Sequence, residues 1–486
     1  MAPSTEDPGR TDRTDAHGNR RATRPGRPGR RRWGAVVGLC LALLAPLLIS
    51  SAQADSPHTG STAKKPPAAI AYRTTTVLLG DDDVIGALYR PKSPTPHQST
   101  GLVLTHENDN FIGSVPCLEL AKRGFTVLCV KSQYAEQAAV EWDKLALDVG
   151  ASVRYLRGLS TVHKVTLVGW SGGGAIMAYY QNVAQNGVGA CRAPARLDPC
   201  DDDLKGMPPA DGVVLLDAIP GIAFSDLTAL DASVTDESDL RHRDASLDMY
   251  DPANGYDPHG SSYGTGFTHR YLDGQAAREA GLIAEAQRLR GEVADGKGQF
   301  SDDTPMPVGR YSARIWQADS SLMAHTKGSY PVLSPRHPHG GKPQVVHSVR
   351  VPSADPAPNE AWDGSKGGFT ADSFLSVGAI RADHLRITAD SISGVDWSST
   401  NTATLGNVRG ISSPLLIMSM TGHYWLVPSE MYYRGATHAK DKQLVFVEGA
   451  EHGFTPCDAC ASHPGQFGDT VKETFDYVAD WVGRHK

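Results

Sequence analysis

The sequence lacks the features that mark several common classes of protein. It has no excess of basic residues, since 47 Lys and Arg stand against 54 Asp and Glu for a formal net charge of −7. No basic stripe runs along it, which makes nucleic acid a poor candidate partner. Its apolar run from Gly34 to Ile49 is shorter than the ~20 residues of a membrane-spanning helix. We therefore expect neither nucleic-acid binding nor stable membrane association by the mature protein.

The apolar run fits a signal peptide better than a single membrane anchor. It follows an Arg-rich leader that ends in Arg30-Arg31-Arg32, and Ala52-Gln53-Ala54 offers an A-x-A cleavage site. The predictions are a signal peptide over residues 1–54 with cleavage after Ala54, then a polar linker over 55–67. The mature protein would be secreted, with the general and twin-arginine routes undecided.

Cysteine is also scarce. Of seven cysteines, Cys40 falls in the leader, and an even number left in an exported chain makes disulfides plausible. The two pairs that are close in sequence are expected to be bonded, while the other two cysteines lie in apolar surroundings typical of buried thiols. No second C-x-x-C or matching histidine pair is present, so no metal is expected. The expected bonds are Cys191–Cys200 and Cys457–Cys460, and the sequence leaves the state of Cys117 and Cys129 open.

What is present is a strand, a turn and a helix around one serine. Val165–Val168 is an apolar run typical of a buried strand, and Gly169-Trp-Ser171-Gly-Gly173 follows it. A helix is expected from Ala175. In this context G-x-S-x-G predicts that Ser171 occupies a strained turn with its Oγ above the sheet, as a nucleophile. The alternative is a serine in an ordinary tight turn.

Segments on both sides of this motif alternate between strand and helix patterns. Residues 72–79 and 84–90 predict a hairpin, residues 135–156 a helix with one buried face, and residues 213–216 a strand with Asp217 at its tip. Such alternation predicts an α/β fold, with a mostly parallel sheet covered by helices on both faces.

Regular patterns stop between residues 224 and 405, where residues 275–294 form the one convincing helix. A structureless loop of this length is implausible inside a compact domain, so an inserted cap or lid is expected there. The core would then comprise residues 68–223 as its first part and 406–486 as its second part.

A serine nucleophile needs a base within hydrogen-bond reach. His452 lies in Gly449-Ala-Glu-His452-Gly, directly after a predicted strand over 444–447. A flanking glycine leaves this loop free to reach the carboxyl edge of the sheet. His452 is therefore the expected base.

These segments together resemble the α/β-hydrolase superfamily. The hairpin, His106-Glu107-Asn108, G-W-S-G-G and G-A-E-H-G-F carry the resemblance, and the H-E-N loop is similar to that of dienelactone-hydrolase-like members. The resemblance implies an oxyanion hole made by the backbone N–H groups of Gly172 and Asn108. For His106 and Glu107 a loop-fixing hydrogen bond is equally acceptable.

The acid of the expected triad departs from the family pattern. Members usually carry G-x-x-D shortly before V-P, but Thr421-Gly-His-Tyr-Trp-Leu-Val-Pro428 contains no carboxylate. Asp217, at the strand next to the nucleophile, is the favoured acid. Glu430 is the alternative acid, although a helix N-terminal cap would also explain it.

The sequence thus favours a secreted serine esterase that cleaves a carboxylic ester or lactone, with no cofactor. Local similarity of 418–428 and 448–457 to secreted bacterial hydrolases that include zearalenone-type lactonases makes an apolar lactone attractive. The alternatives are a peptidase or amidase on the same fold, and a catalytically silent binding protein. The sequence does not indicate an oligomeric state.

Overall fold

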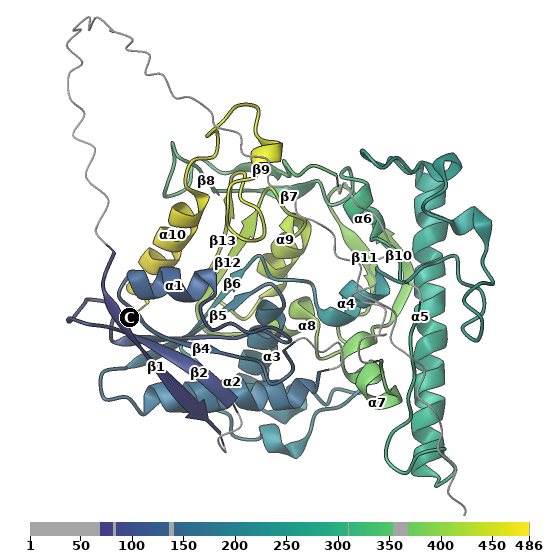
Figure 1. The fold of residues 1–486 in the computed structure, drawn as a ribbon, viewed down its shortest axis with the longest axis horizontal. Helices are drawn as coiled ribbons and strands as arrows, with labels where there is room; N and C mark the ends of the chain where they lie inside the picture. Colours follow the sequence, from purple (N-terminus) through teal and green to yellow (C-terminus); the bar gives the residue numbers. More distant parts are fainter. Residues whose placement is uncertain (1–68, 81–83, 136–139, 310, 353–367, 486) are drawn as a thin grey trace, which may run out of the picture. The chain divides into compact units, whose positions relative to one another are not determined.

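The computed structural model describes residues 69–80, 84–135, 140–309, 311–352 and 368–485 (Figure 1). The predicted signal peptide and linker lie outside the described residues and stay predictions. Residues Pro67–Lys486 form one compact unit. Among the described residues, no helix combines the length and apolar character needed to cross a bilayer.

A nine-stranded sheet forms the centre of this unit. β1 and β2 form the expected hairpin, and β2 is also antiparallel to β4, whereas every other neighbouring pair is parallel. The predicted fold class, a mostly parallel sheet of the α/β-hydrolase type, is confirmed. In spatial order the strands are β1 (Tyr72–Leu79), β2 (Val84–Pro91), β4 (Thr126–Val130), β3 (Thr100–Leu104), β5 (Lys164–Trp170), β6 (Gly212–Leu216), β12 (Leu415–Met420), β13 (Lys442–Val447) and β8 (Val332–Leu333).

The central strands are apolar on both faces because helices cover both. In β5, Val165 and Leu167 face one hydrophobic cluster while Val168 faces the other, as expected from the alternation of side chains along a strand. The helices on one face are α1 (Val115–Lys122) and α10 (Thr470–Arg484). The helices on the other face are α2 (Trp142–Arg157), α3 (Gly172–Asn186), α8 (Thr404–Val408) and α9 (Leu426–Gly435).

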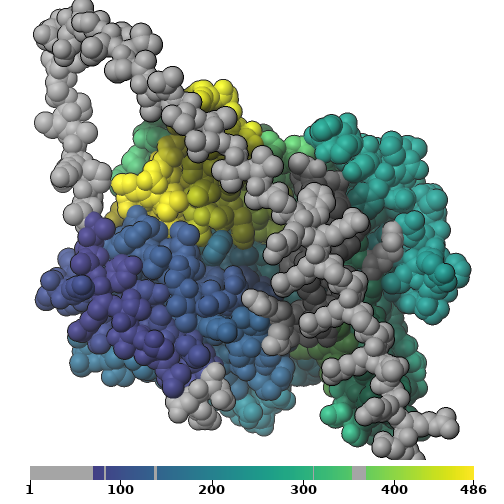
Figure 2. Space-filling view, viewed as in Figure 1, coloured from purple at the N-terminus to yellow at the C-terminus, as the bar shows by residue number. Residues whose placement is uncertain are grey.

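The segment predicted as an insert contains short elements and one long helix, α5, at the side of the unit away from β1 and β2 (Figures 1 and 2). Its aromatic side chains, such as Tyr271, belong to the same hydrophobic cluster as Tyr179 of α3. The predicted boundaries at 224 and 405 fall inside helices α4 and α8. The elements are α4 (Ile222–Leu227), α5 (Thr265–Ala294), α6 (Ile315–Ala318), β7 (His325–Tyr330), β9 (Gln344–His347), α7 (Ala371–Ser373), the π-turn Phe374–Gly378, β10 (Ala382–Ile387) and β11 (Ile392–Val395), together with β8.

Two helix predictions differ from the structure. α2 begins at Trp142 rather than Ala135, and residues 132–135 form a turn in which the Ser132 hydroxyl accepts a hydrogen bond from the Tyr134 N–H (3.0 Å). α5 begins ten residues before Gln275, at Thr265. Gly266 and Gly274 weaken the local helix pattern, but burial of Tyr271 and its neighbours stabilises the extra turns.

Candidate functional site

The turn between β5 and α3 presents Ser171 at the carboxyl edge of the sheet. Ser171 has φ 58° and ψ −128°, a strained conformation for a residue with a side chain. The close approach of strand and helix requires the neighbouring glycines. A Cβ on Gly169 would lie 2.5 Å from the carbonyl oxygen of Gly173, and one on Gly173 would collide with the carbonyl oxygen of Thr105.

Two further elements bring a histidine and a carboxylate to this serine. His452 follows β13, and its Nε2 lies 2.9 Å from Ser171 Oγ. Its Nδ1 lies 2.7 Å from Oδ2 of Asp217, the residue that directly follows β6. The structure therefore brings together Ser171, His452 and Asp217, residues that lie up to 281 positions apart in the chain. These are hydrogen-bond separations.

Asp217 is fully buried but has a polar partner on each oxygen. Its Oδ1 accepts from the Ser419 hydroxyl (3.1 Å) and from the Met420 N–H (3.2 Å). Its Oδ2 contacts two imidazoles, those of His423 (2.6 Å) and His452 (2.7 Å). Burial alone would raise the pKa of Asp217, but the two histidines outweigh burial and hold that pKa well below its usual range. Asp217 is therefore ionised at neutral pH.

His423 is the residue of this group that the sequence analysis missed. Its ring stacks on His452, with centroids 4.2 Å apart and planes inclined by 23°. Burial lowers the pKa of His423, an effect that Asp217 opposes and His452 reinforces. The sequence could have indicated His423, because it lies just beyond β12, in the segment where the expected family pattern carries its acid.

Glu430, the alternative acid, does not reach His452. It lies in α9, where its carboxylate accepts from the backbone N–H groups of Lys327 (2.7 Å) and Gly328 (2.8 Å) and from the Tyr330 hydroxyl (3.0 Å). These bonds connect α9 to β7. Glu430 is thus neither in the group around Asp217 nor an N-terminal cap.

Of the two residues expected to form the oxyanion hole, Gly172 directly follows the serine. Gly172 is the first residue of α3, where backbone N–H groups have no intrahelical partner. The Asn108 N–H points to the ring of His106 at 3.4 Å. The Glu107 carboxylate packs so closely on Gly172 that a Cβ there would overlap it, and burial raises the pKa of Glu107. His106 Nδ1 lies 3.0 Å from Oε2 of Glu107, but that oxygen has no hydrogen-bond partner among the described residues, so this contact is not the loop-fixing hydrogen bond.

Aromatic side chains surround the His452 loop. The Trp170 indole N–H donates to the His452 carbonyl at 3.0 Å, which anchors the loop backbone directly beside the serine. Trp170 also packs on Phe111 and Phe454, with ring centroids 5.8 and 5.1 Å away. The surroundings of the site are thus largely apolar on this side.

Asp217, His423 and His452 form the one group in the described residues whose side chains and proximity could suit a metal ion. Ligand atoms of Asp217, His423 and His452 all lie within 4.8 Å of one another. Zinc at 2.0–2.2 Å from each ligand would separate neighbouring ligand atoms by about 3.4 Å. The observed separations of 2.6 and 2.7 Å from Asp217 are shorter than this spacing.

Three disulfide bonds lie elsewhere in the compact unit. Two are those expected, Cys191–Cys200 and Cys457–Cys460. The third joins Cys117 and Cys129, whose state the sequence left open, because helix α1 packs on β4 and brings the two Cα atoms to 6.3 Å. Sequence spacing alone does not reveal that contact.

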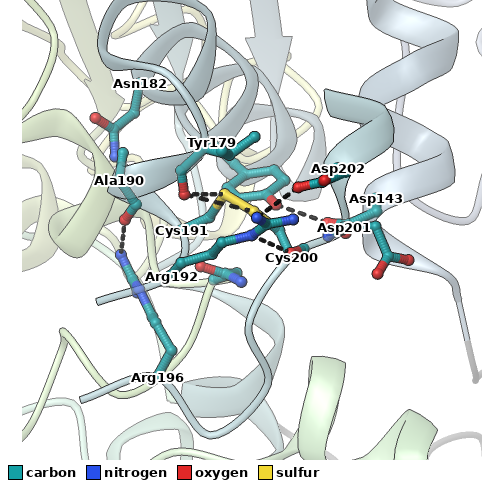
Figure 3. The surroundings of a disulfide bond; sticks show 12 residues. Asp143, Tyr179, Asn182, Ala190, Cys191, Arg192, Arg196, Cys200, Asp201 and Asp202 are labelled. Atoms are coloured by element: carbon teal, nitrogen blue, oxygen red, sulfur yellow. Dashed lines mark hydrogen bonds and ion pairs between the residues drawn. A yellow bond between two sulfur atoms is a disulfide. The ribbon is translucent and has the colours of Figure 1, made fainter. Parts of the chain in front are cut away.

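Polar contacts hold the segment around Cys191–Cys200 (Figure 3). Arg192 donates to the Cys200 carbonyl (2.7 Å) and pairs with Asp202 (2.5 Å). Asp143 accepts from the Tyr179 hydroxyl (2.6 Å) and from the Asp201 N–H (2.8 Å), which attaches the segment to helices α2 and α3. The disulfide therefore lies on the outer side of the helix that follows Ser171.

No family model and no curated protein matches the chain. Solved structures with a similar arrangement include a hypothetical protein from Pseudomonas aeruginosa, at 15% identity over 88% of this chain and 99% of that chain, with a TM-score of 0.37. Brefeldin A esterase, a bacterial homologue of human hormone sensitive lipase, is similar at 13% identity over 88% and 81%, with a TM-score of 0.36. The α/β hydrolase GrgF from Penicillium sp. is similar at 11% identity over 86% and 99%, with a TM-score of 0.37.

Proposed function

We propose that this chain of the α/β-hydrolase fold is a secreted serine hydrolase that cleaves a carboxylic ester or lactone through an acyl-enzyme. The observation that carries the proposal is the continuous chain of short contacts from Ser171 Oγ to His452 (2.9 Å) and from His452 to Asp217 (2.7 Å). A base hydrogen-bonded to the hydroxyl, with a carboxylate on its other ring nitrogen, is the arrangement that activates a serine.

In the first half of the reaction, Ser171 Oγ attacks the carbonyl carbon while its proton passes to His452 Nε2. The negative oxygen of the tetrahedral intermediate would accept from the Gly172 N–H and, once released from His106, the Asn108 N–H. The bond to the alcohol oxygen then breaks, and that oxygen takes the proton from His452. In a lactone the released alcohol stays attached to the acyl group.

In the second half, water attacks the acyl-enzyme and gives its proton to His452. Collapse of the second tetrahedral intermediate breaks the ester bond to Ser171, whose oxygen recovers that proton. Asp217 stabilises the imidazolium present in both halves. The aromatic rings of Phe111 and Trp170 next to the site support an apolar acyl or alcohol group.

Secretion is supported by the three disulfides, which persist in oxidising compartments. The structure carries no observation that favours a peptidase or a silent binding protein over this function. Both remain outcomes of the experiment below.

Replacing the serine tests the proposal. Ser171→Ala should lower hydrolysis of p-nitrophenyl esters by several orders of magnitude, because the nucleophile is lost. The unfolding temperature should stay unchanged, because the substitution removes no contact in the hydrophobic core. A fluorophosphonate probe should label the wild type at Ser171 and leave the variant unlabelled. Exposed Ser462→Ala is the matched control and should behave as wild type.

Each alternative function predicts a different outcome of this experiment. Cleavage of aminoacyl amides in preference to esters and lactones would make the protein a peptidase. Absence of labelling and of turnover in the wild type would make it a binding protein. Turnover above a tenth of the wild-type value in Ser171→Ala would remove Ser171 from the reaction.

A further inference from the structure

A second histidine shares the carboxylate that serves His452. Oδ2 of Asp217 lies 2.6 Å from Nδ1 of His423 and 2.7 Å from Nδ1 of His452. The two rings come from different loops, one after β12 and one after β13, and stack with their centroids 4.2 Å apart. A triad requires only one of these imidazoles, so His423 is left without a role in the reaction as described.

The short contact determines where the proton on His423 lies. A bare ring nitrogen and an ionised carboxylate oxygen 2.6 Å apart repel each other, whereas a protonated ring nitrogen is attracted to that oxygen. Asp217 is ionised, so His423 carries the proton on Nδ1, as His452 does in its resting tautomer. The contact is bent, because no acceptor lies along the N–H direction of His423. It therefore acts mainly through charge and dipole.

The Nδ1 groups of His423 and His452 both face Oδ2 of Asp217 and so share its negative charge. The negative charge of Asp217 stabilises the imidazolium that forms on His452. A second N–H dipole on the same oxygen reduces the potential that His452 experiences. The imidazolium of His452 is then stabilised less than it would be opposite a carboxylate of its own.

We propose that His423 is a positioning residue that shares the charge of Asp217 with His452 and thereby extends activity to more acidic pH. The proposal rests on the proposed serine hydrolase function. His423 has no contact with Ser171 among those described, so it acts through Asp217 and through its stacked ring.

Other charged and titratable groups face this pair. Around His423 these are Asp217, His452, Tyr424, whose ring centroid is 4.2 Å away, and Arg350, whose guanidinium lies over the Tyr424 ring. Around His452 they are Asp217, His423, Ser171 and, electrostatically, the buried Glu107. Burial above all, and Arg350 to a smaller extent, lowers the pKa of His423, which favours the neutral ring with its N–H dipole.

Two substitutions separate the donor from the ring. His423→Asn keeps an N–H donor on Cγ, where Nδ1 is attached, and removes the stacked ring. His423→Phe keeps a stacking ring and removes the donor. His463→Asn, at an exposed histidine that bonds only within its own loop, is the control.

The measurement is the pH profile of kcat/KM for an activated ester, together with the rate at which fluorophosphonate labels Ser171. In His423→Phe the acidic limb of both profiles should move to higher pH by about 0.5–1 unit, with less than about a threefold change on the alkaline plateau. In His423→Asn and His463→Asn the limb should stay at its wild-type position.

An equal loss of rate at every pH in both His423 variants, without movement of the limb, would assign His423 a merely structural role and overturn the proposal. Wild-type behaviour of both variants would overturn it as well. Failure of the serine hydrolase function has a different signature, the absence of labelling in the wild type.

One readout needs no activity and no variant. Two-dimensional ¹⁵N NMR of the wild-type histidines should show His423 as the Nδ1–H tautomer between pH 6 and 8. A proton on Nε2 of His423 would overturn the proposal even if His423→Phe fails to fold.

Discussion

Two buried carboxylates near the carboxyl edge of the sheet have opposite surroundings. Asp217, at the end of β6, faces two imidazoles, the Ser419 hydroxyl and one backbone N–H. Glu430, in α9, faces two backbone N–H groups, a tyrosine hydroxyl and, at 3.7 Å, the guanidinium of Arg434. Both are almost fully buried, with exposures of 0% and 3%. Burial therefore does not distinguish a group that supports chemistry from one that joins two elements.

The groups that contact each carboxylate distinguish Asp217 from Glu430. Backbone N–H groups and a tyrosine hydroxyl do not take up a proton at neutral pH, so Glu430 is limited to holding β7 against α9. Imidazoles exchange protons in the physiological range, so Asp217 can stabilise a charge that appears and disappears during a reaction. The three predictions below test this contrast.

The largest effect is expected at Asp217. Asp217→Asn should lower kcat/KM for an activated ester by roughly 10³–10⁴, because the amide neither stabilises an imidazolium nor selects the required tautomer of His452. Steady-state kinetics with matched circular dichroism spectra provide the measurement. The matched variant is Glu430→Gln, and a larger loss of turnover in Glu430→Gln would reverse the assignment of the acid.

A smaller effect, on stability, is expected at Glu430. Glu430→Gln should lower the free energy of unfolding by about 1–3 kcal/mol, because one of three buried donors loses a charged acceptor. Turnover should stay within about twofold of wild type. Urea unfolding measures the first quantity, with Glu451→Gln on the exposed loop as control. An unchanged unfolding curve would show that the α9–β7 connection contributes nothing.

The smallest effect concerns a third buried carboxylate, Asp226 in α4, which has no histidine beside it. Burial raises the pKa of Asp226 to about 7, although Arg314 opposes the shift. Between pH ~4 and ~7 the unfolded chain loses this proton before the folded chain does, so this group lowers the free energy of unfolding as pH rises. Asp217, whose pKa is lowered, instead stabilises the fold above pH ~4 and loses that contribution in acid.

Unfolding curves at pH 5 and pH 8 test this sign. The loss of stability between these pH values should be smaller in Asp226→Asn than in wild type by roughly 2–3 kcal/mol. Exposed Asp383→Asn should leave the difference unchanged. A greater loss in Asp226→Asn would contradict the raised pKa.

Local patterns in the sequence carried the prediction of most of the core. The hairpin of β1 and β2, the apolar strand β5 and the alternation of strands with helices follow from residue type and spacing over a few turns of chain. The turn at Ser171 could also be predicted from local pattern, because glycines are required wherever a strand and a helix come this close. Gly266 and Gly274 show the limit of such patterns, since helix α5 continues through both.

The sequence by itself determined the fold class, the serine turn and the placement of a histidine after the last long strand. It left open the choice between Asp217 and Glu430 and the state of Cys117 and Cys129, and it overlooked His423. Only the tertiary structure decided these, because each depends on contacts between segments remote in the chain, such as the 235 positions between Asp217 and His452. The residue pattern of a segment indicates which helix or strand that segment forms. The hydrogen-bond partner of a buried polar group depends instead on which donor the packing of other segments brings within about 3 Å.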